Sequence, residues 1–198
     1  KNKNLLDKDI VVNTNAAALP SKFIDLTKGF TDLTFTISID AIGKKLTYTR
    51  WPIKWDKFVD NINTLYKISN GQLHFNTTLS VYNIADCYET FKWIGDNYPM
   101  AGITTTILDN PEIQQAKFFP NKDEVLQNLN KIKTLPYYNK DKNFASVIDY
   151  AETQCTETQL DPVMLAKFFE FNDLLDDSRK VLLKDHLPLL EDCRKYVK

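Results

Sequence analysis

Four short segments of the chain have strand character, at residues 10–13, 33–40, 73–81 and 102–108, and polar side chains recur at every second position in the last three. This period of two is typical of β-strands. The stretches between these segments carry apolar side chains at helical spacing, over residues 20–28, 55–68 and 84–98. Successive strands start roughly 25 to 40 residues apart, which suits a crossover helix that returns to a parallel strand and is too long for a hairpin. The pattern therefore predicts an α/β fold with a parallel sheet.

One face of the second, third and fourth predicted strands is polar. The side chains on this face are Thr34, Thr36, Ser38 and Asp40, then His74, Asn76, Thr78 and Ser80, then Thr104 and Thr106. A closed parallel barrel fills its interior with branched apolar side chains. A face rich in hydroxyl and amide groups therefore indicates an open, hydrated interior that holds a polar ligand. The alternative is an antiparallel sheet with one solvated face, which the helical connections oppose.

The chain after residue 110 has no strand-like segment. Helical spacing runs through its remaining part, over residues 121–133, 143–155, 162–175 and 178–196. Linkers that contain proline separate these stretches at residues 118–120 and 135–138. We therefore expect residues 1–110 to form an α/β body and residues 111–198 to form a helical appendage.

Composition narrows the classes of function. The 26 acidic and 25 basic residues give a net charge of −1, which provides no long-range attraction to nucleic acid or anionic lipid. Five glycines without phosphate-loop spacing exclude Walker and Rossmann motifs, and two histidines exclude a multi-histidine metal site. No apolar run approaches the roughly 18 residues that span a bilayer. Because Cys87, Cys155 and Cys193 are odd in number and far apart, they fit a reducing compartment. We expect a cytoplasmic protein without nucleic-acid or membrane partners.

The end of the second predicted strand carries a motif. The sequence 38–41, Ser-Ile-Asp-Ala, is followed by Arg50 and by a helix that contains Trp55, Asn61 and Ile62. This segment resembles the fourth strand of radical S-adenosylmethionine enzymes, especially members with a twitch or SPASM-type C-terminal region. Three further segments resemble parts of the same family in the same order, at residues 13–20, 76–83 and 171–189. The resemblance extends over roughly the whole chain.

The resemblance implies a partial (β/α)6 barrel, similar to a TIM barrel, of which this chain would hold strands three to six. The family's Cys-x-x-x-Cys-x-x-Cys loop and its Gly-Gly-Glu-Pro strand end do not occur in the sequence, and we expect both upstream of Lys1, in an N-terminal part that is missing. The implied cofactors are S-adenosylmethionine and a [4Fe-4S] cluster, whose ligands would lie in that upstream part. The implied partners are a small-molecule or peptide substrate and an electron donor such as flavodoxin or ferredoxin. The full enzyme would generate a 5'-deoxyadenosyl radical that abstracts a substrate hydrogen, whereas this chain alone is expected to be inactive.

The resemblance also implies which side chains hold S-adenosylmethionine, namely Ser38, Asp40, Arg50, Asn15 and Asn83. Chemistry supports two of them, because a guanidinium can bind a carboxylate through two parallel hydrogen bonds, and a hydroxyl at the carboxyl end of a parallel strand points into the ligand crevice. Each residue also has a purely structural interpretation. Arg50 could form an ion pair with Asp40, and the other residues could cap turns or helices. The sequence identifies no catalytic residue and no metal ligand.

Two other functions stay open. One is a non-catalytic α/β binding or scaffold module derived from the same fold. The other is an aldolase-like lyase, in which Lys44 or Lys45 would form an imine with a carbonyl substrate. Lysines on a turn usually stay solvated and keep their ordinary pKa, which disfavours the lyase.

Overall fold

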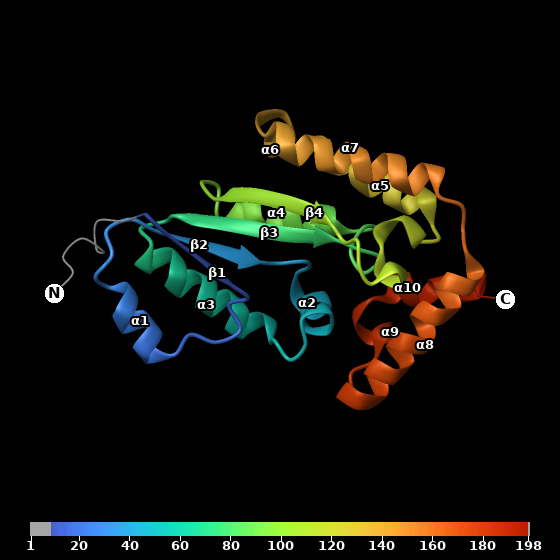
Figure 1. Cartoon of the computed structure of the whole chain (residues 1–198), viewed down its shortest axis with the longest axis horizontal. Coiled ribbons are helices and arrows are strands. Elements are labelled where there is room, and N and C mark those ends of the chain that lie inside the picture. The colour runs from blue at the N-terminus through green and yellow to red at the C-terminus, as the bar shows by residue number, and fades with distance from the viewer. Residues whose placement is uncertain (1–8, 198) are drawn as a thin grey trace.

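The structure is a computed structural model that describes residues 9–197 (Figure 1). One sheet contains four strands in the order β1-β2-β3-β4, with β1 at Ile10–Thr14, β2 at Leu33–Ser38, β3 at Leu73–Leu79 and β4 at Gly102–Ile107. The three neighbouring pairs are all parallel. The predicted α/β class with a parallel sheet is therefore confirmed, and the antiparallel alternative is wrong.

The two faces of the sheet differ as the alternation predicts. The side chains of one face are buried, including Leu33, Phe35, Ile37, Leu73, Phe75 and Ile103. On the other face the side chains are half-buried or exposed, and the register places Thr36 beside His74 and Ser38 beside Asn76. A hollow of about 350 Å³ lies over this polar face, lined by Val11, Thr34, Thr36, His74, Asn76 and Thr104. The sheet thus presents hydroxyl, amide and imidazole groups to an open space.

Three crossover helices cover the apolar face, α1 at Ser21–Thr27, α3 at Trp55–Ile68 and α4 at Cys87–Asn97. Helix α3 buries Phe58, Ile62 and Leu65, which share one side of the helix because they lie four and three residues apart. The rings of Trp55 in α3 and Trp93 in α4 approach edge to face, with centroids 5.0 Å apart. A short helix, α2 at Gly43–Thr49, follows β2.

The described chain after β4 is helical, as predicted. Its elements are η2 (Glu112–Gln114), η3 (Ala116–Phe118), α5 (Lys122–Ile132), α6 (Pro136–Lys140), α7 (Lys142–Glu157), α8 (Pro162–Arg179), α9 (Leu183–His186), α10 (Pro188–Glu191) and η4 (Asp192–Tyr196). Helix α7 packs along β4, whereas α8, α9 and α10 lie beyond the carboxyl ends of the strands, next to α2 (Figure 1). The later part of the chain therefore covers the end of the sheet at which ligands bind in parallel α/β proteins.

The single helix predicted over residues 178–196 is wrong. Helix α8 continues to Arg179 and ends at Lys180, whose φ of 54° is left-handed. Helix α9 ends before Pro188, because a proline has no amide hydrogen to donate and its ring clashes with the preceding turn. The predicted linker at residues 135–138 contains the start of α6, where Pro136 occupies the first turn, a position that tolerates proline.

Within residues 9–197, no helix is long and apolar enough to cross a membrane. The division of the chain near residue 110 stays a prediction.

Candidate ligand site at the carboxyl ends of the strands

Asp40 and Arg50 meet beyond the end of β2. A terminal nitrogen of Arg50 lies 2.7 Å from Oδ2 of Asp40, and Oδ1 of Asp40 accepts a hydrogen bond of 2.9 Å from the backbone N–H of Thr78 at the end of β3. Arg50 follows the last residue of α2 and donates its own backbone N–H to the carbonyl of Leu46. Arg50 and Asp40 thus form the ion pair that is expected if Arg50 has a purely structural role. The pair links the ends of β2 and β3 to α2.

Two groups at this end of the sheet have unused hydrogen-bonding capacity. The Nε of Arg50 is buried and has no hydrogen-bond partner. Ser38 ends β2 on the polar face, beside Asn76, and its hydroxyl has no hydrogen-bond partner among residues 9–197. A buried donor without a partner is costly. A ligand that supplied an acceptor to Arg50 would remove that cost.

The side-chain amide of Asn83 forms its hydrogen bonds with backbone groups. Its Nδ2 donates 2.9 Å hydrogen bonds to the carbonyls of Asp40 and Thr78, and its Oδ1 accepts a hydrogen bond of 2.8 Å from the N–H of Ser80. The residue is 1% exposed, and both of its amide hydrogens are used. Asn83 therefore holds the two strand ends together, and its contact with a ligand stays a prediction.

Asn15 lies in an exposed turn after β1. Its Oδ1 accepts a hydrogen bond of 3.1 Å from the N–H of Ala17, and within residues 9–197 it forms no hydrogen bond with Ser38, Asp40 or Arg50. The next residue, Ala16, is buried with a φ of 50°, a conformation that favours glycine. Its carbonyl accepts a hydrogen bond of 2.7 Å from Nδ2 of the buried Asn61. Two of the segments that carry the resemblance are thus joined here.

Helix α8 contributes a buried polar network that the pattern of the sequence does not predict. The hydroxyl of Tyr48 in α2 lies 2.7 Å from Oδ1 of Asp176 and 2.9 Å from Oδ1 of Asn172. Oδ2 of Asp176 accepts a hydrogen bond of 2.7 Å from the N–H of Leu183, and Arg179 donates to the carbonyl of Tyr48. Burial, together with the bond to Asp176, raises the pKa of the Tyr48 phenol far above its usual range. Tyr48 therefore stays protonated and acts as a donor that fixes α2, two residues before Arg50.

The lysines of the lyase hypothesis lie in α2. Lys45 forms an ion pair with Asp86, and burial raises the pKa of the Asp86 carboxyl although Lys45 opposes the shift. Lys44 is exposed, and its carbonyl contacts Nδ1 of His186 at 2.7 Å. An amine that is held as the cation of an ion pair is a poor nucleophile. The imine-forming role of either lysine stays a prediction.

The three cysteines are separate and buried. Burial raises the pKa of each thiol, to about 12 for Cys87 and about 11 for Cys155 and Cys193. A cysteine ligates a metal as its thiolate, which a raised pKa disfavours. In residues 9–197 no three histidine, cysteine, aspartate or glutamate side chains gather as a possible metal site. The described residues thus do not fit an iron-sulfur cluster.

His74 gives a testable pH dependence of stability. Burial lowers the pKa of its imidazole below the ordinary value of 6.5, and the charge of Asp141 opposes this shift. The unfolded chain therefore takes up the proton before the folded chain does, so the free energy of unfolding should fall as the pH drops below about 6.5. Urea unfolding between pH 7.5 and 5.5 checks this, with His74→Gln as the comparison. We expect the variant to lose less stability on acidification than the natural chain, and parallel pH curves would contradict the assignment.

Comparisons of the chain with family models, curated proteins and solved structures find no match. The interpretation of the site therefore depends on its geometry and on the resemblance of short motifs.

Proposed function

We propose that the chain forms strands three to six of a radical S-adenosylmethionine partial barrel and binds the cofactor at the carboxyl ends of β2 and β3. The main support is that segments far apart in the sequence, which carry the motif resemblance, contact one another at this end of the molecule. Asn61 binds the carbonyl of Ala16, Asn83 binds the carbonyl of Asp40, and Asp176 binds Tyr48. A parallel sheet brings the segments that follow its strands to one edge, and here these segments are the ones that carry the motifs.

The free groups of the site fit S-adenosylmethionine. The carboxylate of its methionine part would accept hydrogen bonds from Arg50, including the buried Nε that has no partner. Asp40 would orient the guanidinium, because their ion pair is held from the other side by the N–H of Thr78. The hydroxyl of Ser38 would hydrogen-bond the ribose. The polar face of β2 and β3, which continues from Ser38, would line the substrate cavity.

The [4Fe-4S] cluster, when bound, would supply the electron for cleavage of the sulfonium bond. Residues 9–197 contain no set of ligands for it, so the proposal requires those ligands, the first two strands and the electron-donor site to lie outside the described residues. The coding sequence before residue 1 tests this requirement. A three-cysteine loop there supports the enzyme, and a start codon directly before Lys1 supports the non-catalytic module.

Binding of the cofactor can be tested on the chain as it stands. Amide NMR spectra recorded during titration with S-adenosylmethionine should show saturable shifts at Ser38, Arg50 and Thr78. Arg50→Gln should weaken the binding about tenfold or more, since a charge-assisted bidentate contact is lost. Lys54→Gln, on an exposed lysine in the same loop region, is the matched control and should bind normally. Shifts confined to other parts of the chain, or none at all, would refute this site.

A further inference from the structure

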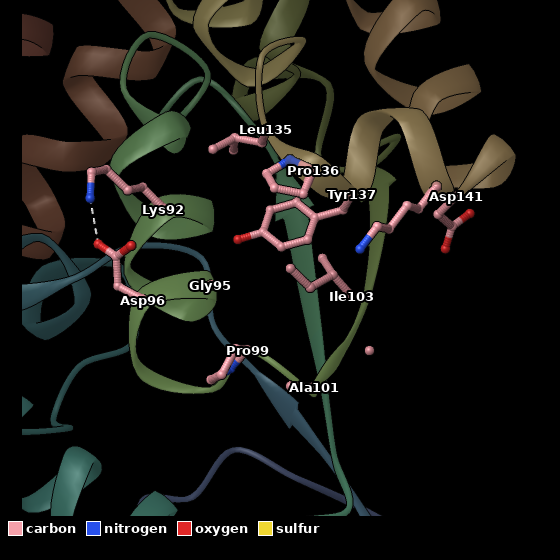
Figure 2. Close-up of a pocket in the computed structure, with 12 residues that line it drawn as sticks. Lys92, Gly95, Asp96, Pro99, Ala101, Ile103, Leu135, Pro136, Tyr137 and Asp141 are labelled. Carbon is pink, nitrogen blue, oxygen red and sulfur yellow. Dashed lines mark hydrogen bonds and ion pairs between the residues drawn. The ribbon is translucent and has the colours of Figure 1, made fainter.

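A second cavity lies at the other end of the sheet, near the start of β4. It has a volume of about 450 Å³ and is bounded by the C-terminal part of α4, the loop that leads into β4, and α6 (Figure 2). Because all four strands are parallel, the beginning of β4 is remote from the carboxyl ends at which Asp40 and Arg50 lie. The cavity is therefore separate from the proposed cofactor site. Its volume falls within the range of roughly 300–1,000 Å³ that is typical of small-molecule sites.

The walls of the cavity are mainly apolar. They are formed by Pro99, Ala101, Ile103, Leu135, Pro136 and the ring of Tyr137. Figure 2 shows Tyr137 and Pro136 on one side of the space and the turn at Pro99 on another. Flat rings and aliphatic groups on facing walls suit a planar apolar ligand.

Contacts within the protein hold the side chain of Tyr137 in place at the wall of the cavity. The Tyr137 hydroxyl donates a hydrogen bond of 2.7 Å to the carbonyl of Phe91 in α4. It can approach α4 this closely because residue 95 is glycine, and a Cβ at Gly95 would collide with the Tyr137 oxygen. The ring also stacks edge to face on Phe144 of α7, with centroids 6.0 Å apart. A ligand would therefore meet a preformed surface, which lowers the entropy cost of binding.

Four charged side chains line the cavity, and two of them, Lys140 and Asp141, form no ion pair among residues 9–197. Lys92 and Asp96 form an ion pair with each other across one turn of α4 (Figure 2). Oδ1 of Asp141 caps α7 by accepting hydrogen bonds of 2.9 and 3.1 Å from the N–H groups of Asn143 and Phe144. Lys140 lines the same cavity and has no carboxylate partner among residues 9–197. Because Asp141 is engaged by the N–H groups at the start of α7, the Lys140 ammonium is the charged group at the cavity that has no partner among the described residues.

We propose that this cavity binds a small carboxylate with a flat, apolar body, whose ring lies between Ile103 and Tyr137 and whose carboxylate pairs with Lys140. The preformed apolar walls favour a ligand with a flat apolar ring, and the ammonium group of Lys140 favours a ligand with a negative charge. The site does not depend on the proposed cofactor site, since neither its residues nor its chemistry are shared with Ser38, Asp40 and Arg50.

The test uses 2-naphthoate as the probe, with the whole 198-residue chain. Saturable amide shifts should occur at Gly95, Ile103 and Tyr137. The neutral 2-naphthamide should bind about threefold to fivefold more weakly, which is the contribution of one partly exposed ion pair. Lys140→Glu should reverse the preference, so that 2-naphthylmethylammonium binds better than 2-naphthoate. Lys167→Glu, at an exposed lysine of α8 outside the cavity, should leave the preference unchanged.

A second variant tests the cavity itself. Ala101→Phe places a ring in the space and should abolish binding while the dispersed NMR spectrum of the folded chain persists. If this variant does not fold, the charge reversal at Lys140 still decides the question. An unchanged preference for the anion in Lys140→Glu would overturn the proposal, and so would probe shifts that are scattered over the chain. Amide shifts at Ser38 and Arg50 would indicate binding at the proposed cofactor site, so the two sites are distinguished by which residues shift.

Discussion

Replacing Asp176 with alanine should lower the free energy of unfolding by about 3 kcal/mol, or roughly 6 to 12 °C in Tm. The Asp176 carboxylate is 8% exposed and accepts hydrogen bonds from the Tyr48 hydroxyl and from the N–H of Leu183. Removal of the acceptor leaves a buried backbone donor without a partner and takes from Tyr48 one of its two contacts. Urea unfolding followed by circular dichroism measures the loss.

The neighbouring aspartate provides the control. Asp177 lies on the same helix and pairs with Lys180 in a fully solvated position, so Asp177→Ala should change stability by less than about 0.5 kcal/mol. A double-mutant cycle with Tyr48→Phe should show a coupling energy between Tyr48 and Asp176 of about 1 kcal/mol or more. Additive effects of the two substitutions would show that the hydrogen bond between Tyr48 and Asp176 does not couple α2 to α8.

Replacing Asn83 with alanine should have an effect of similar size, a loss of about 3 kcal/mol. One side chain here satisfies three backbone groups, the carbonyls of Asp40 and Thr78 and the N–H of Ser80. Water cannot replace all three bonds, because the residue is almost completely buried. The amide resonances of Thr78 and Ser80 should shift as well, since the strand ends lose their common anchor.

Asn130→Ala is the matched control for Asn83→Ala. Asn130 is exposed on α5, and its replacement with a better helix former should leave stability unchanged or slightly higher. If Asn83→Ala were as stable as this control, the hydrogen bonds of Asn83 would contribute nothing net. The interpretation of Asn83 as a structural residue would then be wrong.

The local pattern of the chain predicts the sheet well. The period of two in residues 33–40 and 73–81 places Phe35 and Phe75 inside and Thr36 and His74 outside, and the structure has them so. The parallel direction follows from the length of the connections. The breaks after α8 are harder to predict, because Lys180 adopts a left-handed conformation that neither a glycine nor an asparagine announces in the sequence.

The candidate site can be predicted only in part from the sequence. The resemblance of short motifs selects Ser38, Asp40 and Arg50 in the sequence, and the ion pair between Asp40 and Arg50 follows from their opposite charges. The roles of Asn83 and Tyr48 depend on contacts with distant backbone and side-chain groups. Periodicity carries no information about such contacts. An asparagine that binds three backbone groups looks the same in a sequence as one that caps a turn.

The hydrogen bond between Tyr48 and Asp176 spans 128 positions of the chain. During synthesis on the ribosome, the segment around Arg50 emerges long before α8 exists. The sheet can collapse onto its crossover helices at that stage, but the guanidinium acquires its final support only when the last helices have left the exit tunnel. The assembly of this end of the molecule is therefore a late event in its biogenesis.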